Sequence, residues 1–278
     1  MFQHSQHLYV TSTPTVQELH AIIKKMRSNA SPDPDGLNVG FYKATWEWIS
    51  TDIHKLVSDF YSSAFLNQEI TQTYITLIPK KMQPTVPQDF RPISLCSVIY
   101  RLIAKSLADR LKTYLPNYIH NAQYPFIQNK HISSNMIITQ EIIHSFGLKN
   151  WTGKAFMLKL DLAKAFDHLN WNFLTQALHR LHLRGHFIQL LKCCYNSPSM
   201  AVLVNGRPTE FFTPNRGIRQ GCPLSPFLFA IAINELSITL NQALEDANLQ
   251  GVSLGHNCPP IHSLLFADDL ILCGAANM

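Results

Sequence analysis

The sequence predicts an α+β protein, with helices concentrated in the first part of the chain and an antiparallel sheet in the second. Three observations support this prediction. The first part shows repeated helical periodicity, the second part contains apolar segments with the alternation of strands, and Asn205-Gly206 suits the type I′ turn of a β-hairpin. We expect the boundary near residues 148–154, which gives a helical region over 1–150 and a sheet region over 151–278.

The first helix is predicted by its start signal. Thr15 and Glu18 form a T-x-x-E capping box, which satisfies free amides at a helix N-terminus. The following apolar residues recur with helical spacing and predict a helix that ends near Asn29; they are Leu19, Ile22, Ile23 and Met26. A second helical stretch is expected over 39–65, and residues 73–79 (TYITLIP) favour a strand.

Another amphipathic helix is expected around residues 99–112. Its apolar face consists of Ile99, Leu102, Ile103, Leu107 and Leu111. Its other face carries the charged residues Arg101, Lys105, Arg110 and Lys112, which we expect to face solvent.

The second part of the chain predicts strands at 155–160, 200–204, 211–212, 263–266 and 270–273. The strand at 155–160 ends at Asp161, and the helix after it is expected to turn four residues inward, namely Phe166, Leu169, Phe173 and Leu181. A loop over 215–226 leads into an apolar helix that ends near Leu244. We expect the strands to form one antiparallel sheet with helices on one face.

Composition excludes several protein classes. Of 278 residues, 46% are hydrophobic, which excludes wholesale disorder, and the net charge of +5 permits a polyanionic partner. The longest wholly apolar stretch, 227–233, is too short for a membrane span, and no signal peptide is recognisable at the start. The six cysteines form no CxxC pair, so we expect a reducing, intracellular compartment, in either nucleus or cytoplasm, and no secretion.

Carboxylates stand where apolar strands end. Asp161 closes AFMLKLD, while Asp268 and Asp269 occupy the turn of LLFADDLIL. If these strands are neighbours in one sheet, the three acids converge at one edge, where carboxylate oxygens suit Mg²⁺ and two ions could support phosphoryl transfer. The alternative is that they are solvated turn residues, because Asp is common in turns.

The loop over 215–226 and a basic segment before it are further candidates. Gly217 and Gly221 allow a backbone to approach a ligand closely, and the polar side chains nearby offer donors to phosphate or base edges; these are Arg216, Arg219 and Gln220. The alternative is an ordinary loop at a helix start. Arg91, which follows Lys80 and Lys81, suits a triphosphate, although a solvated basic face would have the same composition.

These motifs, in this order, resemble the reverse transcriptase of non-LTR (LINE-type) retrotransposons, particularly those of plants. The resemblance runs from about Thr15 to Gly274. The matching segments are PDG at 34–36, LIPKK at 77–81, DFRPISL at 89–95, LIAKSLADRLK at 102–112, NMIITQEIIHSF at 135–146, KLDLAKAFD at 159–167, RGIRQGCPLSPFLFAIAINEL at 216–236 and FADDLIL at 266–272.

The resemblance implies a right-hand polymerase, with fingers over 1–150 and an antiparallel palm over 151–278. It implies that Asp161, Asp268 and Asp269 are the catalytic carboxylates, which hold two Mg²⁺ (with Mn²⁺ as a substitute) while a primer 3′-hydroxyl attacks an incoming dNTP. An RNA template and a DNA primer are the implied partners, and neither a membrane nor a protein partner is implied.

The resemblance also implies a set of nucleotide-binding residues. Phe166 matches the position that excludes the ribose 2′-hydroxyl, and Gln220 with Gly221 matches the loop under the nucleotide and template. Arg91, and with it Lys80, matches cations of the fingers near the triphosphate. Asp167 fits the AFD pattern and is expected to be structural.

The sequence departs from the family in three places. Asp33 stands where the family has glycine, and Asn129 and Lys130 replace a glycine and an arginine of a finger turn. No counterpart of the thumb follows the acidic turn, so the chain resembles a fragment of a retrotransposon reading frame. This leaves an alternative: a catalytically inactive remnant that at most binds nucleic acid. A palm-fold nucleotide cyclase is the third reading, and residues 14–150 argue against it.

Overall fold

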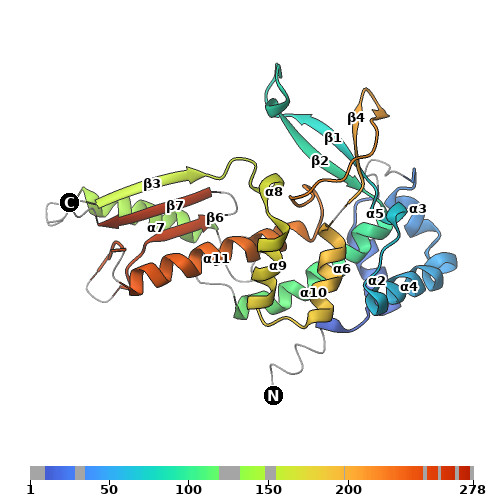
Figure 1. Cartoon of the computed structure of the whole chain (residues 1–278), viewed down its shortest axis with the longest axis horizontal. Coiled ribbons are helices and arrows are strands. Elements are labelled where there is room, and N and C mark those ends of the chain that lie inside the picture. Colours follow the sequence, from blue (N-terminus) through green and yellow to red (C-terminus); the bar gives the residue numbers. More distant parts are fainter. Residues whose placement is uncertain are drawn as a thin grey trace. The chain divides into compact units, whose positions relative to one another are not determined.

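The computed structural model describes residues 10–28, 35–118, 132–147, 155–196, 198–246, 249–255, 258–266 and 269–275 (Figure 1). It divides into two compact units. Unit 1 comprises Met1–Tyr114 and Phe166–Ser225, and unit 2 comprises Leu115–Ala165 and Pro226–Met278. The expected boundary at 148–154 therefore does not separate the two units. The reason is that strands and helices of the early and late parts of the chain pack together.

Unit 1 contains a four-stranded mixed sheet in the order β2-β1-β4-β5. The strands are β1 (Thr73–Pro79), β2 (Phe90–Cys96), β4 (Met200–Val204) and β5 (Arg207–Pro208). β1 pairs antiparallel with β2 along its whole length and parallel with β4 over residues 73–75. This parallel pairing corrects one expectation: the hairpin at 200–208 joins the strand at 73–79, not the sheet of residues 155–161. Its turn does have the expected form, because Asn205 and Gly206 both have positive φ, at 50° and 77°.

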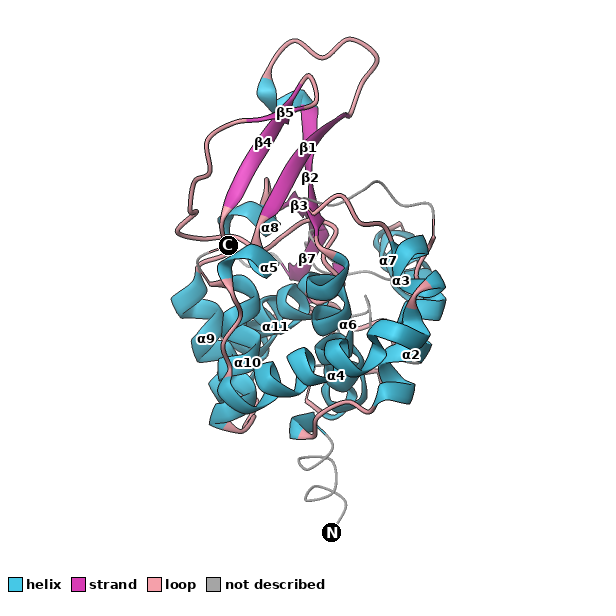
Figure 2. Ribbon diagram, turned by 90° about the vertical axis from the view of Figure 1, so that its right-hand side faces the viewer, coloured by secondary structure: helices cyan, strands magenta, loops and turns pink. Residues whose placement is uncertain are grey.

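The helices of unit 1 gather at one end of this sheet, and the β1–β2 hairpin extends away from them (Figures 1 and 2). They are α2 (Val16–Lys25), α3 (Val39–Ala44), α4 (Trp46–Ser63), α5 (Gln68–Thr71), α6 (Val98–Tyr114), α8 (Ala165–His168), α9 (Trp171–Arg180) and α10 (Gly185–Tyr195). A 3₁₀ turn at Pro87–Asp89 lies between β1 and β2, at the far tip of the hairpin (Figure 1). The capping box of α2 is confirmed, since Glu18 N donates to Thr15 Oγ1 at 3.2 Å and Thr15 N to Glu18 Oε2 at 2.8 Å. The stretch expected over 39–65 is broken at Thr45, whose hydroxyl donates to the Phe41 carbonyl at 2.8 Å.

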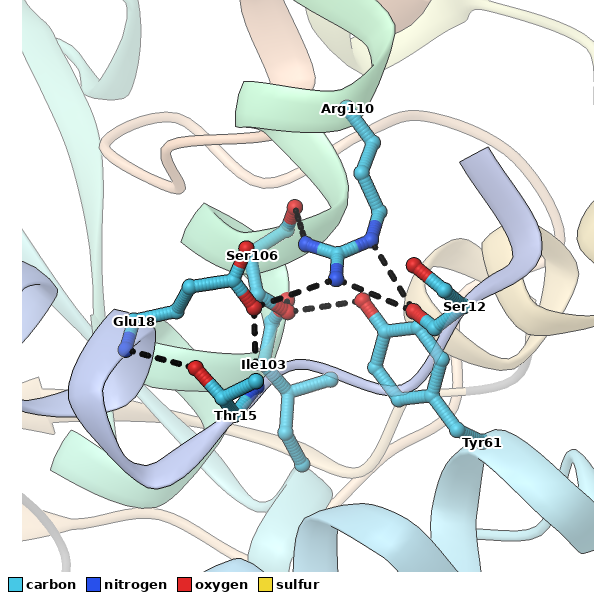
Figure 3. Close-up of polar contacts among 7 residues, drawn as sticks. All are labelled: Ser12, Thr15, Glu18, Tyr61, Ile103, Ser106 and Arg110. Carbon is cyan, nitrogen blue, oxygen red and sulfur yellow. Dashed lines mark hydrogen bonds and ion pairs between the residues drawn. The ribbon is translucent and has the colours of Figure 1, made fainter. Parts of the chain in front are cut away.

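α6 forms the centre of unit 1. Its predicted apolar residues Leu102, Ile103, Leu107 and Leu111 are all buried. Arg110, expected at the surface, is instead only 2% exposed. Figure 3 shows the reason: its guanidinium donates to the carbonyls of Ser12 and Ser106 and lies 3.7 Å from Glu18 Oε2. The guanidinium is buried because backbone carbonyls and a carboxylate replace its water.

The region after Asp161 also differs from expectation. It forms two short helices, α8 and α9, where one helix was expected, and Phe173 is 41% exposed instead of inward-facing. The buried face of α9 consists of Leu174, Ala177 and Leu178. Asn170 caps α9 by accepting from the amides of Asn172 and Phe173, which fixes a helix start that the expectation had missed.

Unit 2 contains a three-stranded antiparallel sheet in the order β3-β7-β6. Its elements are a 3₁₀ turn (Leu115–Asn117), α7 (Ile132–Phe146), β3 (Ala155–Asp161), α11 (Ser225–Glu245), β6 (Ser263–Phe266) and β7 (Asp269–Ala275). α7 packs on one face of the sheet through Ile142, Leu264 and Cys273. Asn135 Nδ2 on α7 donates to the Leu265 carbonyl at 3.1 Å and ties the helix to β6.

Within the described residues, α11 alone is long and apolar enough to cross a membrane by length and composition. Of its most apolar stretch, 56% is buried inside the structure, as in the core helix of a globular protein. Length and composition therefore give only weak evidence for a membrane span.

Candidate active site

The two carboxylates of the sheet in unit 2 lie opposite each other. Asp161 is the last residue of β3, Asp269 is the first residue of β7, and the two are Cα partners in the antiparallel register. Side chains of directly opposite residues lie on the same face of a sheet. The register therefore brings both carboxylates to one end of one face, as expected if the two strands are neighbours. Asp268 lies outside the described residues, so the convergence of all three acids stays a prediction.

A lysine that the sequence reasoning missed completes this cluster. Lys159 Nζ lies 3.0 Å from Asp269 Oδ1. Lys159 precedes Asp161 by two positions in β3, so both side chains lie on the face that also carries Asp269. The signal was present in the sequence as this two-residue period, but its meaning depends on the register of β7.

The chemistry of these groups fits a divalent cation. Carboxylate oxygens are the hard ligands that Mg²⁺ prefers. The Lys159 ammonium already places a positive charge beside the Asp269 carboxylate. Within the described residues, which leave out Asp268, no group of three Asp, Glu, His or Cys side chains is arranged to hold a metal ion. Asp161 and Asp269 thus bring two carboxylates to this end of the sheet.

The loop over 215–226 (the glycine-bearing loop) lies in unit 1 up to Ser225 and is held by backbone hydrogen bonds on both sides. Gly217 N donates to Leu169 O at 2.8 Å and Ile218 N to Phe166 O at 2.9 Å, while Ser94 N donates to Gln220 O at 2.8 Å. The loop therefore joins the α8–α9 segment to strand β2. With Asp167 and sheet residues such as Ile75, it lines a groove of about 220 Å³.

Two contacts with Asp167, one from Gln220 and one from Gly217, fix the conformation of this loop near the groove. Gln220 Nε2 donates to Asp167 Oδ1 at 2.9 Å, so Asp167 has the structural contact expected of it. Gly217, with φ of +89°, packs directly against the Asp167 backbone. The space that its missing side chain leaves is occupied by the chain itself, which corrects the expectation that this glycine serves the approach of a ligand.

Arg219 is also placed differently from expectation. It is 4% exposed, and its donors serve the protein interior: Nη1 donates to Cys194 O at 2.6 Å and to the Tyr100 hydroxyl, and Nη2 donates to Thr71 O at 2.9 Å. Its Cζ lies 4.3 Å from the centroid of the Tyr100 ring. Burial raises the pKa of Tyr100 well above its usual value, against the lowering effect of the Arg219 charge. Arg219 thus anchors the loop and is not available to phosphate or base edges.

The remaining predicted nucleotide-binding residues lie on separate parts of unit 1. Phe166 is half-buried in α8, and its carbonyl accepts from the glycine-bearing loop. Arg91 is exposed in β2, opposite Ile78, and Lys80 is exposed just beyond β1, with Nζ 3.1 Å from Gln88 O. By strand alternation Lys80 and Arg91 share one face of the hairpin, whereas Ile75 lies on the other face, toward the groove beside Gln220.

Comparison with known proteins identifies the family. The family described as reverse transcriptase (RNA-dependent DNA polymerase) matches residues 78–277. The chain is 30% identical over 258 residues to the transposon TX1 uncharacterized 149 kDa protein of Xenopus laevis, covering 93% of this chain and 19% of that protein. It is 29% identical over 270 residues to the Pol polyprotein of the type-2 retrotransposable element R2DM of Drosophila melanogaster, covering 97% of this chain and 24% of that protein.

Among solved structures, apo telomerase from Candida tropicalis is similar, with a TM-score of 0.51 and 13% identity over 83% of this chain and 43% of that chain. This likeness shows the fold. The chain spans about a fifth to a quarter of the length of the two retroelement proteins. The family match covers most of the chain, including both carboxylates, the glycine-bearing loop and part of the β1–β2 hairpin. The chain therefore belongs to the reverse transcriptase (RNA-dependent DNA polymerase) family, with retrotransposon Pol proteins among its relatives.

Proposed function

We propose that this chain is the fingers-and-palm part of a LINE-type reverse transcriptase, which extends a DNA primer along an RNA template. The primer 3′-hydroxyl oxygen forms a bond to the α-phosphorus of a dNTP, and pyrophosphate leaves. The observation that carries the proposal is the register that sets Asp161 opposite Asp269 at the end of the sheet. The family match supports it, because reverse transcriptases generally use divalent metal ions.

The carboxylates have the role of metal ligands in this proposal. Asp161 and Asp269, with Asp268, would hold two Mg²⁺, for which Mn²⁺ can substitute. Bound there, the ions would polarise the phosphoryl group and lower the pKa of the attacking hydroxyl. The chain's own contribution is the strand pairing, which sets the backbone positions of Asp161 and Asp269 before any metal binds.

The residues of unit 1 have the role of nucleotide contacts. Gln220 and Gly221 would lie under the nucleotide and template, and Arg91 with Lys80 would contact the triphosphate. Phe166 would exclude a ribose 2′-hydroxyl by filling the space beside the sugar. Phe166→Ala should then admit ribonucleotides, and unchanged discrimination between dNTP and rNTP would contradict that role.

The test measures primer extension on an RNA template with Mg²⁺, together with Mn²⁺ binding. Asp161→Asn should abolish extension and weaken Mn²⁺ binding. Asp246→Asn is the matched control, because it makes the same change at an exposed position of unit 2. Unchanged extension and Mn²⁺ binding in Asp161→Asn would refute the proposed site. Template binding without extension by the unaltered chain would instead support the alternative, a remnant that only binds nucleic acid.

A further inference from the structure

We infer that Lys159 is an internal counter-cation that competes with divalent metal for Asp269 and thereby sets the metal affinity of the site. This inference rests on the proposed function, because it concerns the same carboxylates. It concerns a positioning residue: Lys159 acts through Asp269 and not on a reacting atom. The argument depends on three features of unit 2, namely the sheet register, the ion pair and the groove beside it.

The sheet register places the two residues of this ion pair next to each other. Lys159 lies opposite Ile271, and Asp269 lies opposite Asp161, so Lys159 and Asp269 are diagonal neighbours across β3 and β7. Diagonal pairs on one face remain within reach of long side chains. The observed distance of 3.0 Å from Lys159 Nζ to Asp269 Oδ1 is that of a direct, charge-assisted contact.

The charges explain why the ammonium is there. Without it, the Asp161 and Asp269 carboxylates would stand opposite each other with no positive charge from their own strands, and like charges directly opposite destabilise a sheet. The Lys159 ammonium halves the net negative charge of the two carboxylates. The same ammonium repels an arriving divalent cation, so a metal ion must displace it from Asp269 or bind beside it.

The structure also offers space for the displaced ammonium. The ion pair lines a groove of about 310 Å³, whose opposite wall is α7 with Asn135, Thr139 and Gln140. The hydroxyl oxygen of Thr139 and the amide oxygen of Gln140 can accept hydrogen bonds from an ammonium. Asn135 Oδ1 is fully buried and is therefore not among these acceptors, although Asn135 belongs to the lining of the groove. Lys159 can therefore leave Asp269 without losing all polar partners.

The size of the effect follows from Coulomb's law. A unit charge about 6 Å from a divalent cation in a medium close to water changes the binding constant about tenfold, which equals about 1.4 kcal/mol. The side chains of Lys159 and Asp269 are 67% and 45% exposed, so added salt should reduce the effect. A role in folding alone would not produce this salt dependence of metal affinity.

The test is Mn²⁺ titration of the full chain, followed by the electron paramagnetic resonance of free Mn²⁺. Lys159→Met should bind Mn²⁺ about tenfold more tightly than the unaltered chain at low salt, and the difference should shrink in 0.5 M salt. Lys159→Arg keeps the charge and should bind nearly as the unaltered chain does. Lys105→Met is the matched control, because Lys105 also forms an aspartate pair, at 2.7 Å from Asp109, but on α6 in unit 1.

The outcomes separate the inference from the proposed function. Equal Mn²⁺ affinities of Lys159→Met and the unaltered chain, with loss of binding in Asp161→Asn, would overturn the inference and leave the metal site standing. Absence of Mn²⁺ binding in every variant would overturn both. If Lys159→Met folds poorly, Lys159→Gln provides the same charge removal, and the Mn²⁺-induced rise in melting temperature should be larger in it than in Lys159→Arg.

Discussion

Replacing Gly217 by alanine tests how the glycine-bearing loop is held. A Cβ at this position would lie 2.7 Å from the Asp167 carbonyl oxygen and 3.1 Å from its carbonyl carbon. Both are backbone atoms, so neither can move aside by changing a rotamer. Gly217 also has φ of +89°, which L-residues rarely adopt. The substitution therefore combines backbone strain with a steric overlap against the α8 segment.

The expected loss of stability is the sum of these terms. Positive φ costs an L-residue about 1–2 kcal/mol, and the smaller entropy of the unfolded alanine chain returns about 0.4–1 kcal/mol. Forcing the overlap with Asp167 adds about 1–3 kcal/mol, as for other overpacked sites. Gly217→Ala should thus destabilise unit 1 by about 1–5 kcal/mol. Gly206→Ala shares the positive φ, at +77°, but has no atom within 4 Å of the new Cβ, so it should cost less than about 2 kcal/mol.

Urea denaturation of the two variants, followed by circular dichroism, measures the difference. The strain term is common to both, so the difference between them reports the contact with Asp167. Gly217→Ala should also weaken the binding of a dNTP, because the same loop carries Gln220. If the two variants lose the same stability within about 0.5 kcal/mol, the close approach of Gly217 to Asp167 does not hold the loop, and the reasoning is wrong.

Three further predictions concern unit 1. Burial raises the pKa of Tyr61 to about 12, so above pH 10 the Tyr61 hydroxyl keeps its proton in the folded state and loses it in the unfolded state. The free energy of unfolding should therefore fall by about 2–3 kcal/mol between pH 10 and 12. Tyr61→Phe should remove this part of the decline in alkaline melting curves. Arg110→Met should cost about 2–3 kcal/mol in urea denaturation, because the carbonyls of Ser12 and Ser106 lose a charged donor. Glu18→Gln should cost less than about 1 kcal/mol, because the Glu18 side chain is partly solvated, and equal losses would contradict this. The Thr85 amide donates a hydrogen bond to Asp89 and lowers the pKa of its carboxyl, so NMR titration should give a pKa below the ordinary value of 3.8. The stability that the Asp89 carboxylate adds to the β1–β2 loop should be present above pH 3.8 and disappear as the pH falls through the lowered pKa. A pKa at or above 3.8 would refute the contact.

Local signals in the sequence predicted the features that depend on a few neighbouring residues. The Thr15–Glu18 capping box and the Asn205-Gly206 turn were correct because their hydrogen bonds and dihedral angles are set within four residues. The convergence of Asp161 and Asp269 was predicted only for the case in which their strands are neighbours in one sheet. The register of these two strands could not be predicted from the sequence, because period-two patterns alone do not say which strand is the partner.

The features that the sequence did not predict depend on distant partners. Arg110 is buried by the carbonyl of Ser12, 98 positions away, and Arg219 by that of Thr71, 148 positions away. A charged residue on a helix or loop gives no local sign that backbone carbonyls will replace its water. The parallel pairing of β1 with β4 has the same origin, since its two strands lie far apart in the sequence. Lys159 was overlooked because its partner Asp269 belongs to another strand.

The division of the chain separates the two groups of candidate residues. Asp161 and Asp269 belong to unit 2, whereas the nucleotide-side candidates, from Lys80 to Gly221, belong to unit 1. Two of the recognisable motifs span a crossing between units: the chain passes from Asp161 to Phe166 across one, and from Gln220 into α11 across another. In the proposed function, catalysis needs both crossings to be held in a defined geometry, because the proposed metal ligands and the proposed nucleotide contacts belong to different units. In the proposed function, metal binding depends on the register of one small sheet, and nucleotide selection depends on the loop that Arg219 anchors.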